Sequence, residues 1–237
     1  MSVPLVCLPG LLCTPAVWDD TLAAAGLSAH VPMLAASDRM EQIAEDVLHG
    51  SPERFVLAGH SMGGYVALEI MRLAPERVAG LFLSSTSARA DDEGQRARRG
   101  EAVEKARAVG MAEFAASIAR FLLHPQSAAS PVVRERMVKM AEAVGFETFA
   151  RHQQAIASRS DHRGRLASVK CPATVIVGAS DRVTPPAPAE EIVSLLPGAE
   201  LGVIADAAHM TLIENPLSSA LALSELLQTV GREAAHA

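Results

Sequence analysis

The chain has 237 residues, of which 49% are hydrophobic, 20% are charged and only 3% are aromatic, and its formal net charge is -6. This composition excludes a disordered chain, and so few aromatic side chains argue against nucleic-acid binding through stacked bases. Pro and Gly interrupt the long uncharged stretches and the first Lys or Arg is Arg39, so we expect neither a membrane span nor a secretory leader. Three cysteines without metal-ligand spacing predict reduced thiols in a cytoplasmic protein that binds no metal.

The first 87 residues alternate apolar strands with amphipathic helices. We expect, in chain order, a strand at 3–8, a helix from near Asp19, a strand around 29–34, a helix from about 38 to 50, a strand at 55–58, a helix at 63–73 and a strand at 78–84. The first strand is stopped by Pro9-Gly10, and the second helix begins with the capping-box pattern Asp38-x-x-Glu41. Such alternation with short connections is typical of a parallel sheet covered by helices.

Helical periods and many arginines replace this alternation from residue 88 to about 167. We expect helices at 101–109, 112–123, 132–144 and 149–158, then a strand at 173–177, a helix at 187–196, a strand at 200–204 and a helix at 216–230. The chain is therefore predicted to form one discontinuous α/β domain, residues 1–87 and 168–237, with a helical lid inserted at 88–167. Residues 88–170 contain fifteen Lys and Arg against ten Asp and Glu, which predicts either solvated helix faces or a basic surface for an anionic substrate or acidic partner.

The segment Gly59-His60-Ser61-Met62-Gly63 has the pattern Gly-x-Ser-x-Gly between a predicted strand and a predicted helix. This pattern is typical of a nucleophile elbow, in which a serine occupies a strained turn and two glycines let neighbouring backbone pass close to it. The helix that follows directs its N-terminal amides at the reacting centre. Ser61 is therefore a candidate nucleophile.

A serine nucleophile needs a base and a carboxylate that orients the base, and in this type of fold they follow in the order Ser, acid, His. Asp181 comes just after the strand at 173–177 and His209 just after the strand at 200–204, so the same edge of the sheet would present both beside Ser61. None of the seven other histidines follows a predicted strand at a position where it could act as the base of Ser61. Asp206 is the main rival of Asp181 for the role of the orienting carboxylate.

Acyl transfer also requires backbone N–H groups that bind the developing oxyanion. We predict that these are the amide of Met62, the residue after the candidate nucleophile, and the amide of Leu11, in the loop after the first strand. Plain packing would explain both residues equally well, because a backbone role leaves almost no signal in the side chain.

These motifs resemble those of the alpha/beta-hydrolase superfamily, and the chain is similar to small-lidded bacterial carboxylesterases of the pimeloyl-carrier-protein methyl ester esterase and 3-oxoadipate enol-lactone hydrolase type. The resemblance rests on four segments in order: Leu8-Pro-Gly-Leu11 with Trp18, residues 59–64, residues 172–185, and Ala207-Ala-His209 with Glu214-Asn-Pro216. It implies a mostly parallel, doubly wound sheet, a triad of Ser61, Asp181 and His209, an oxyanion hole from Leu11 and Met62, and a helical lid. Two departures are Pro9-Gly10, where many relatives have His-Gly, and a start at Val3 that predicts a sheet without the usual N-terminal hairpin.

We therefore expect a serine hydrolase that cleaves a carboxylic ester, thioester or lactone through an acyl-enzyme, without a cofactor. Two alternatives stay open: a lyase that uses the same triad to abstract a proton from a polyanionic substrate, and a non-enzymatic ligand receptor. Substrate contacts are expected from Trp18, Arg120, Phe121, Arg151 and Arg159, although arginine stems lying along helix surfaces would explain the arginines as well. An acidic acyl-carrier protein is a further candidate partner for the basic lid, and the oligomeric state stays open.

Overall fold

Five parallel strands form the centre of the molecule within residues 3–236, the part of the chain that the computed structural model describes. They lie side by side in chain order and span β1 (Leu5–Leu8), β2 (Phe55–His60), β3 (Val78–Ser84), β4 (Ala173–Gly178) and β5 (Glu200–Ile204). β1 to β4 are buried along their whole length, whereas β5 is a partly exposed edge. Because all four pairings are parallel, the carboxyl ends of the strands meet at one edge of the sheet.

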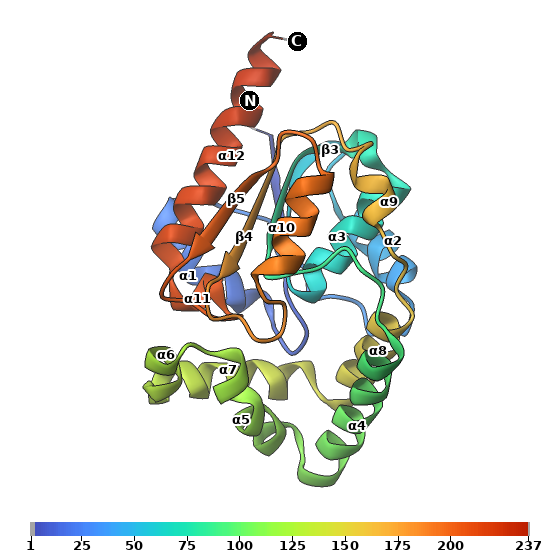
Figure 1. Cartoon of the computed structure of the whole chain (residues 1–237), viewed down its shortest axis with the longest axis vertical. Helices are drawn as coiled ribbons and strands as arrows, with labels where there is room; N and C mark the ends of the chain where they lie inside the picture. The colour runs from blue at the N-terminus through green and yellow to red at the C-terminus, as the bar shows by residue number, and fades with distance from the viewer. Residues whose placement is uncertain (1–2, 237) are drawn as a thin grey trace.

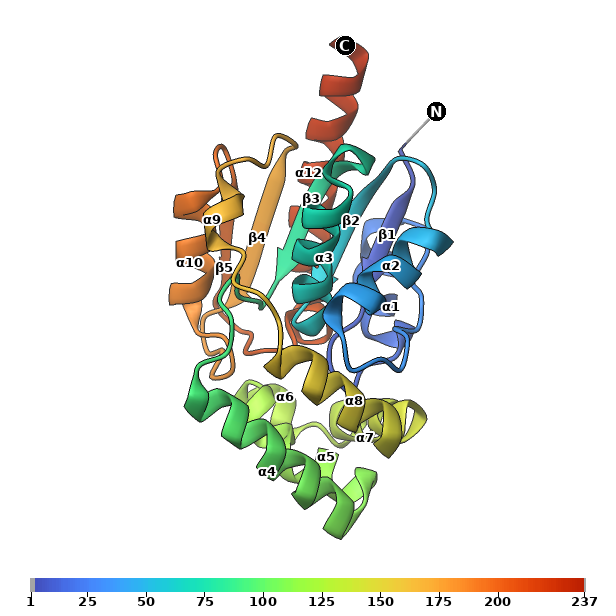
Figure 2. The same cartoon turned by 90° about the vertical axis from the view of Figure 1, so that its right-hand side faces the viewer.

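Helices cover both faces of this sheet, as Figures 1 and 2 show. One face carries α1 (Asp19–Ala25) and α12 (Pro216–His236), and the other carries α2 (Met40–Gly50), α3 (Met62–Leu73) and α10 (Pro186–Leu195). Successive strand side chains alternate between the two cores, so that Leu57 and Val175 pack on the α3 side while Val56 and Ile176 pack on the α12 side. The prediction of an α/β fold with a parallel sheet is confirmed.

A separate layer of helices lies beyond the carboxyl ends of the strands (Figure 1). We call it the helical layer; it consists of α4 (Glu93–Val109), α5 (Met111–Leu122), α6 (Pro125–Ala129), α7 (Pro131–Val144) and α8 (Phe146–Ala157). The remaining elements are the 3-10 helices Pro15–Trp18 and Pro75–Arg77 and the short helices α9 (Arg163–Leu166) and α11 (Thr211–Glu214). The helical layer thus covers the sheet edge at which the predicted site residues follow their strands.

Two local predictions are wrong. The strand expected around 29–34 is reduced to a single bridge between Val6 and His30. The capping box expected at Asp38-x-x-Glu41 does not form, because α2 begins at Met40 after an uncapped Arg39, and the Glu41 carboxylate instead forms ion pairs with Arg39 and Arg72. In the second place a long-range ion pair with Arg72 holds the carboxylate that the local pattern assigned to the cap.

A real capping box lies elsewhere and changes the length of α4. The Asp92 carboxylate accepts a hydrogen bond from the Gln95 amide at 2.7 Å, and the Gln95 side chain accepts from the Asp92 amide at 2.9 Å. The helix therefore begins at Glu93 rather than at 101. The other three helices expected in this segment are present with their ends shifted by a few residues.

Candidate active site

Ser61 makes the whole turn between β2 and α3, because the strand ends at His60 and the helix begins at Met62. Its backbone is strained, with φ 53° and ψ -114°, a combination that residues other than glycine rarely adopt. A Cβ at Gly59 would lie 2.4 Å from the carbonyl oxygen of Gly63, and one at Gly63 would lie 2.3 Å from that of Leu8. Both glycines are thus required for the close approach that the Gly-x-Ser-x-Gly pattern predicts.

Three hydrogen bonds hold this strained turn in place. The amide of Ser61 donates to the Ser84 carbonyl at 2.8 Å, which ties the turn to the end of β3. The Ser61 carbonyl accepts from the Gly64 amide and from the Thr86 hydroxyl, both at 2.9 Å. The backbone is therefore fixed on both sides, and the side chain is left to point out of the turn.

His209 joins Ser61 to Asp181. Its Nε2 lies 2.8 Å from Ser61 Oγ, and its Nδ1 lies 2.9 Å from Asp181 Oδ2. The side chains of His209 and Asp181 are buried, at 5% and 0% exposure, whereas Ser61 is partly exposed. Since the carboxylate can only accept, Nδ1 carries the proton and Nε2 is free to accept from the serine hydroxyl. The structure therefore brings together the three residues that the sequence singled out.

The carboxylate of Asp181 is oriented by its own loop. One oxygen accepts from the amides of Val183 and Thr184 at 2.8 and 2.9 Å, and the other accepts from the Thr184 hydroxyl at 2.9 Å. Burial raises the pKa of Asp181, but the charge of His209 and these hydrogen bonds lower it by more than burial raises it. The pKa of Asp181 therefore lies below its ordinary value. Sequence reasoning missed Thr184, although the short spacing Asp-x-x-Thr after a strand is a detectable signal for such a turn.

The rival residues are placed differently. Asp206 is exposed, and within residues 3–236 the hydrogen-bond partners of the His209 ring are Ser61, Asp181 and Thr184 instead. A second Ser–His pair exists at His60 and Ser84, with Nδ1 and Oγ 3.2 Å apart, but both residues are fully buried and the Ser84 hydroxyl also bonds the Thr211 hydroxyl at 2.7 Å. Because no substrate can reach it, this second pair is better explained as support beneath the partly exposed Ser61.

The two predicted oxyanion amides flank the candidate nucleophile. The loop that carries Leu11 passes close to it, since a Cβ at Gly10 would lie 3.3 Å from Ser61 Cβ. The Met62 amide is the first of α3, where the helix dipole favours negative charge. Within residues 3–236 neither amide donates a hydrogen bond to the protein. Neither amide is therefore used as a donor within these residues, and their role as an oxyanion hole stays a prediction.

The five predicted substrate contacts divide into two groups. Trp18 is fully buried, packs against Phe82 and donates from Nε1 to the Leu8 carbonyl at 3.1 Å, so it supports the end of β1 from within the core. The structure therefore gives no support to a substrate contact for Trp18. Arg120, Phe121 and Arg151 are exposed on the helical layer, and their predicted role as substrate contacts stays a prediction.

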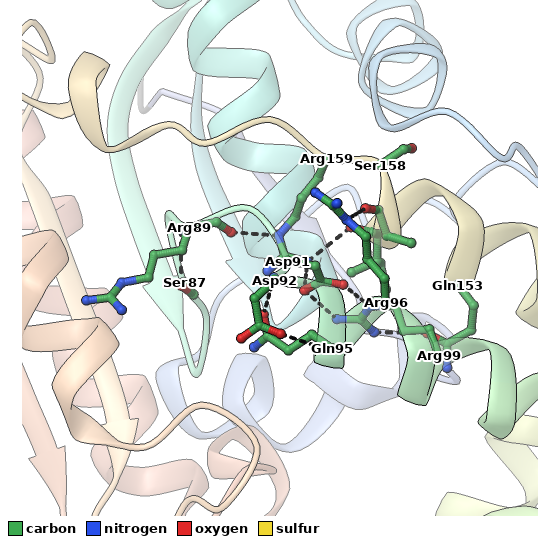
Figure 3. A network of polar contacts seen from close by, with 12 residues as sticks. Ser87, Arg89, Asp91, Asp92, Gln95, Arg96, Arg99, Gln153, Ser158 and Arg159 are labelled. Atoms are coloured by element: carbon green, nitrogen blue, oxygen red, sulfur yellow. Dashed lines mark hydrogen bonds and ion pairs between the residues drawn. The ribbon is translucent and has the colours of Figure 1, made fainter.

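Arg159, the fifth candidate, belongs to a buried polar network (Figure 3). Its Nη1 donates to Asp91 at 2.6 Å, and its guanidinium lies 4.1 Å from the centre of the Tyr65 ring. Asp91 also pairs with Arg99, which in turn donates to the Gln153 side chain at 2.9 Å. Because this arginine is only 6% exposed and already paired, its environment is structural, contrary to the predicted substrate contact.

A small apolar cavity of about 20 Å³ lies between the helical layer and the candidate site. Its walls include Leu11 from the predicted oxyanion loop, Met210 next to His209, and Ile118 and Met137 from α5 and α7. A cavity of this size holds about one water-sized group. The apolar lining, which includes Leu11 and Met210, suits a small hydrocarbon group of a ligand.

Within residues 3–236, no group of three or more His, Cys, Asp and Glu side chains is arranged to hold a metal ion. No helix in the same range is long and apolar enough to cross a membrane.

Comparisons with known proteins agree with this geometry. The sequence profile of a family described as alpha/beta hydrolase fold matches residues 9–216. A pimeloyl-[acyl-carrier protein] methyl ester esterase from Aromatoleum aromaticum is 27% identical over 248 residues, covering 94% of this chain and 98% of that protein. The dihydrolipoyllysine-residue acetyltransferase component of an acetoin cleaving system from Pseudomonas putida is 33% identical over 190 residues, but the match covers 74% of this chain and 47% of that protein. The chain thus spans about half the length of this second relative.

The fold is also found among solved structures. A thermophilic esterase from Thermogutta terrifontis superposes with a TM-score of 0.89 at 28% identity, covering 97% of this chain and 91% of that chain. Together with the family profile, this superposition confirms the resemblance that the four sequence segments predicted.

Proposed function

Because the chain belongs to the alpha/beta-hydrolase family, we propose that it is a serine hydrolase that cleaves a carboxylic ester, thioester or lactone through an acyl-enzyme on Ser61. The observation that carries this proposal is the relay from Ser61 Oγ through His209 to Asp181, with separations of 2.8 and 2.9 Å. The esterase names of two relatives support the same class of reaction. Every group that the reaction needs belongs to the chain, so the proposal includes no cofactor.

In the first half of the reaction, His209 Nε2 takes the proton of Ser61 as the serine oxygen attacks the acyl carbon of the substrate. The amides of Leu11 and Met62 stabilise the oxyanion of the tetrahedral intermediate. The protonated His209 then gives its proton to the leaving alcohol, thiol or lactone oxygen, and the acyl group stays on Ser61. Asp181, ionised at neutral pH because its pKa is lowered, stabilises the charged imidazole.

Water completes the cycle in the second half. His209 takes a proton from a water molecule, whose oxygen attacks the acyl carbon of the ester formed with Ser61. When the second tetrahedral intermediate collapses, the proton returns to Ser61 Oγ and the carboxylic acid leaves. The serine is regenerated, so one bond is cleaved and one water is consumed in each turnover.

The two alternatives receive less support. A lyase acting on a polyanion would need several free arginines near the site, but Asp91 already binds Arg159, so only Arg120 and Arg151 of the three predicted arginines are exposed. A ligand receptor would need neither the strained backbone of Ser61 nor its alignment with His209, and such strain is typical of sites where it serves the chemistry. The observations therefore favour hydrolysis.

We further propose that residues 88–167, which contain the helical layer, act as the lid over this site and help to select the substrate. Four of its arginines are paired with three aspartates: Arg99 and Arg159 share Asp91, Arg136 pairs with Asp20, and Arg163 pairs with Asp161. This pairing weakens the argument for an anionic substrate or an acidic acyl-carrier partner. Arg120 and Arg151 are exposed and stay the candidates for such contacts.

The proposal is tested by treating the protein with a fluorophosphonate and locating the adduct by mass spectrometry. Such a reagent phosphonylates a serine that a base activates. We expect a single adduct on the peptide that contains Ser61, and loss of labelling in Asp181→Asn and His209→Ala. An unlabelled Ser61 in a folded protein would contradict the proposal.

A further inference from the structure

The loop that carries His209 is bound to the connection between α5 and α6 through one carboxylate. Glu214 Oε1 accepts from the amides of Ala208 and Met210, at 2.9 and 3.1 Å, on both sides of His209. Its other oxygen, Oε2, accepts from the amide of His124 at 2.6 Å. His124 directly precedes α6, so this side chain bridges α11 and the helical layer, which face each other in Figure 1.

A second hydrogen bond also joins the His209 loop to the helical layer. The amide of His209 itself donates to the carbonyl of Leu122, the last residue of α5, at 3.0 Å. Three consecutive amides, those of Ala208, His209 and Met210, are therefore fixed either by Glu214 or by the end of α5. Hydrogen bonds to a carboxylate are stronger than those between neutral groups, so Glu214 forms the firmest part of this connection.

We infer that Glu214 is a positioning residue that couples the end of α5 to His209, so that the location of the helical layer sets how His209 approaches Ser61. The inference rests on the proposed function, because it gives His209 the role of base. A shift of about 1 Å at a catalytic group can cost about 100-fold in rate. A helical layer joined in this way is part of the catalytic geometry in addition to covering the site.

The two oxygens of Glu214 allow its two connections to be separated. In Glu214→Gln, the single amide oxygen can serve the amides of Ala208 and Met210, but the amide nitrogen that replaces Oε2 is a donor and cannot bind the N–H of His124. The substitution therefore keeps the side that holds the His209 loop and breaks the side that holds the helical layer.

His124 offers the matched change on the other partner. Its φ of -58° is already that of proline, and Leu123 before it is extended, as a residue before proline prefers. His124→Pro thus removes the N–H donor without a new backbone conformation. His124→Ala removes the imidazole but keeps the donor, so it is the control for the side chain.

The experiment measures kcat and KM for p-nitrophenyl acetate, the rate of fluorophosphonate labelling, and the melting temperature of each variant. We expect Glu214→Gln and His124→Pro each to lower kcat and the labelling rate about 10-fold with little change in KM, and His124→Ala to match the wild type. The double variant should lose no more than either single variant, because both changes remove the same bond.

Two results would overturn the inference: wild-type kcat in Glu214→Gln and His124→Pro, or a double variant whose loss is the product of the single losses. A lower melting temperature without a change in kcat would likewise assign Glu214 to stability alone. Failure of the proposed function is distinguishable, because the wild-type protein itself would then hydrolyse no ester and take no label.

Discussion

Arg159 donates a hydrogen bond of 2.6 Å to Asp91, and this pair joins the two ends of the helical layer. Asp91 lies just before α4 and Arg159 just after α8, and the side chains are 0% and 4% exposed. Burial raises the pKa of Asp91, but Arg99 and Arg159 lower it below its ordinary value, so the carboxylate is charged at neutral pH. The segment that leaves the sheet and the segment that returns are thus fixed to each other.

Asp91→Asn should destabilise the fold by about 3 kcal/mol, because removing one partner of a buried ion pair leaves uncompensated charge on the arginines. Urea unfolding at pH 7 measures this change. Asp161→Asn is the control, since its pair with Arg163 is exposed and worth under about 1 kcal/mol. Equal destabilisation by the two substitutions would contradict a structural role for the buried pair.

His60 should make the fold less stable in mild acid. Burial, and next the nearby His209, lower the pKa of His60 from 6.5 to about 3. Between these pH values the unfolded chain binds a proton that the folded chain does not, so the free energy of unfolding falls as pH decreases below 6.5, by up to about 1.4 kcal/mol per pH unit. Above pH 6.5, His60 is neutral in both the folded and the unfolded chain, so it no longer makes the free energy of unfolding depend on pH.

Urea unfolding from about pH 6.5 down to about 4.5, above most of the carboxylate titration range, measures this dependence. We expect His60→Gln to flatten the slope, because glutamine does not titrate. His49→Gln, at an exposed position, should leave the slope as it is in the wild type. An unchanged slope in His60→Gln would show that another group takes up the proton.

The apolar cavity beside Leu11 should limit the length of the acyl chain. At about 20 Å³ it has room for roughly one methyl group, so the wild type should prefer p-nitrophenyl acetate to the hexanoate. Met137→Ala enlarges the cavity and should raise the hexanoate-to-acetate ratio of kcat/KM about 15-fold, if the added space takes two more methylenes at about 0.8 kcal/mol each.

The control for this prediction is Val132→Ala, which shortens a side chain of the same helix that is 75% exposed. The hexanoate-to-acetate ratio of kcat/KM in Val132→Ala should equal that of the wild type. A ratio of rates is insensitive to the fraction of protein that is folded, so a loss of stability in Met137→Ala does not mimic the effect. Wild-type selectivity in Met137→Ala would place the acyl chain elsewhere.

The sequence predicted those parts of the site that depend on local backbone. Gly59 and Gly63 lie two residues from Ser61 because the turn brings them against other backbone atoms, and that requirement is visible in the pattern itself. Asp181 and His209 each follow a strand, and parallel strands bring their carboxyl ends together. Chain order and strand position were therefore enough to select these residues.

Side-chain partners from distant segments could not be predicted in the same way. The bond between Glu214 and the His124 amide joins residues 90 positions apart, and that between Arg159 and Asp91 joins residues 68 apart. The basic composition of residues 88–170 allowed either solvated helix faces or a basic binding surface, whereas Arg159 is buried in its ion pair. Charge counted along a sequence does not show which charges are paired.

The most direct test of the account is the kcat of Ser61→Ala with p-nitrophenyl acetate, compared with that of the wild type under the same conditions. The wild-type serine lies 2.8 Å from His209 Nε2, and alanine removes the nucleophile without enlarging the side chain at this turn. We predict that kcat falls by about six orders of magnitude, as expected for the loss of a serine nucleophile. Ester hydrolysis at the wild-type rate by purified Ser61→Ala protein would contradict the central claim.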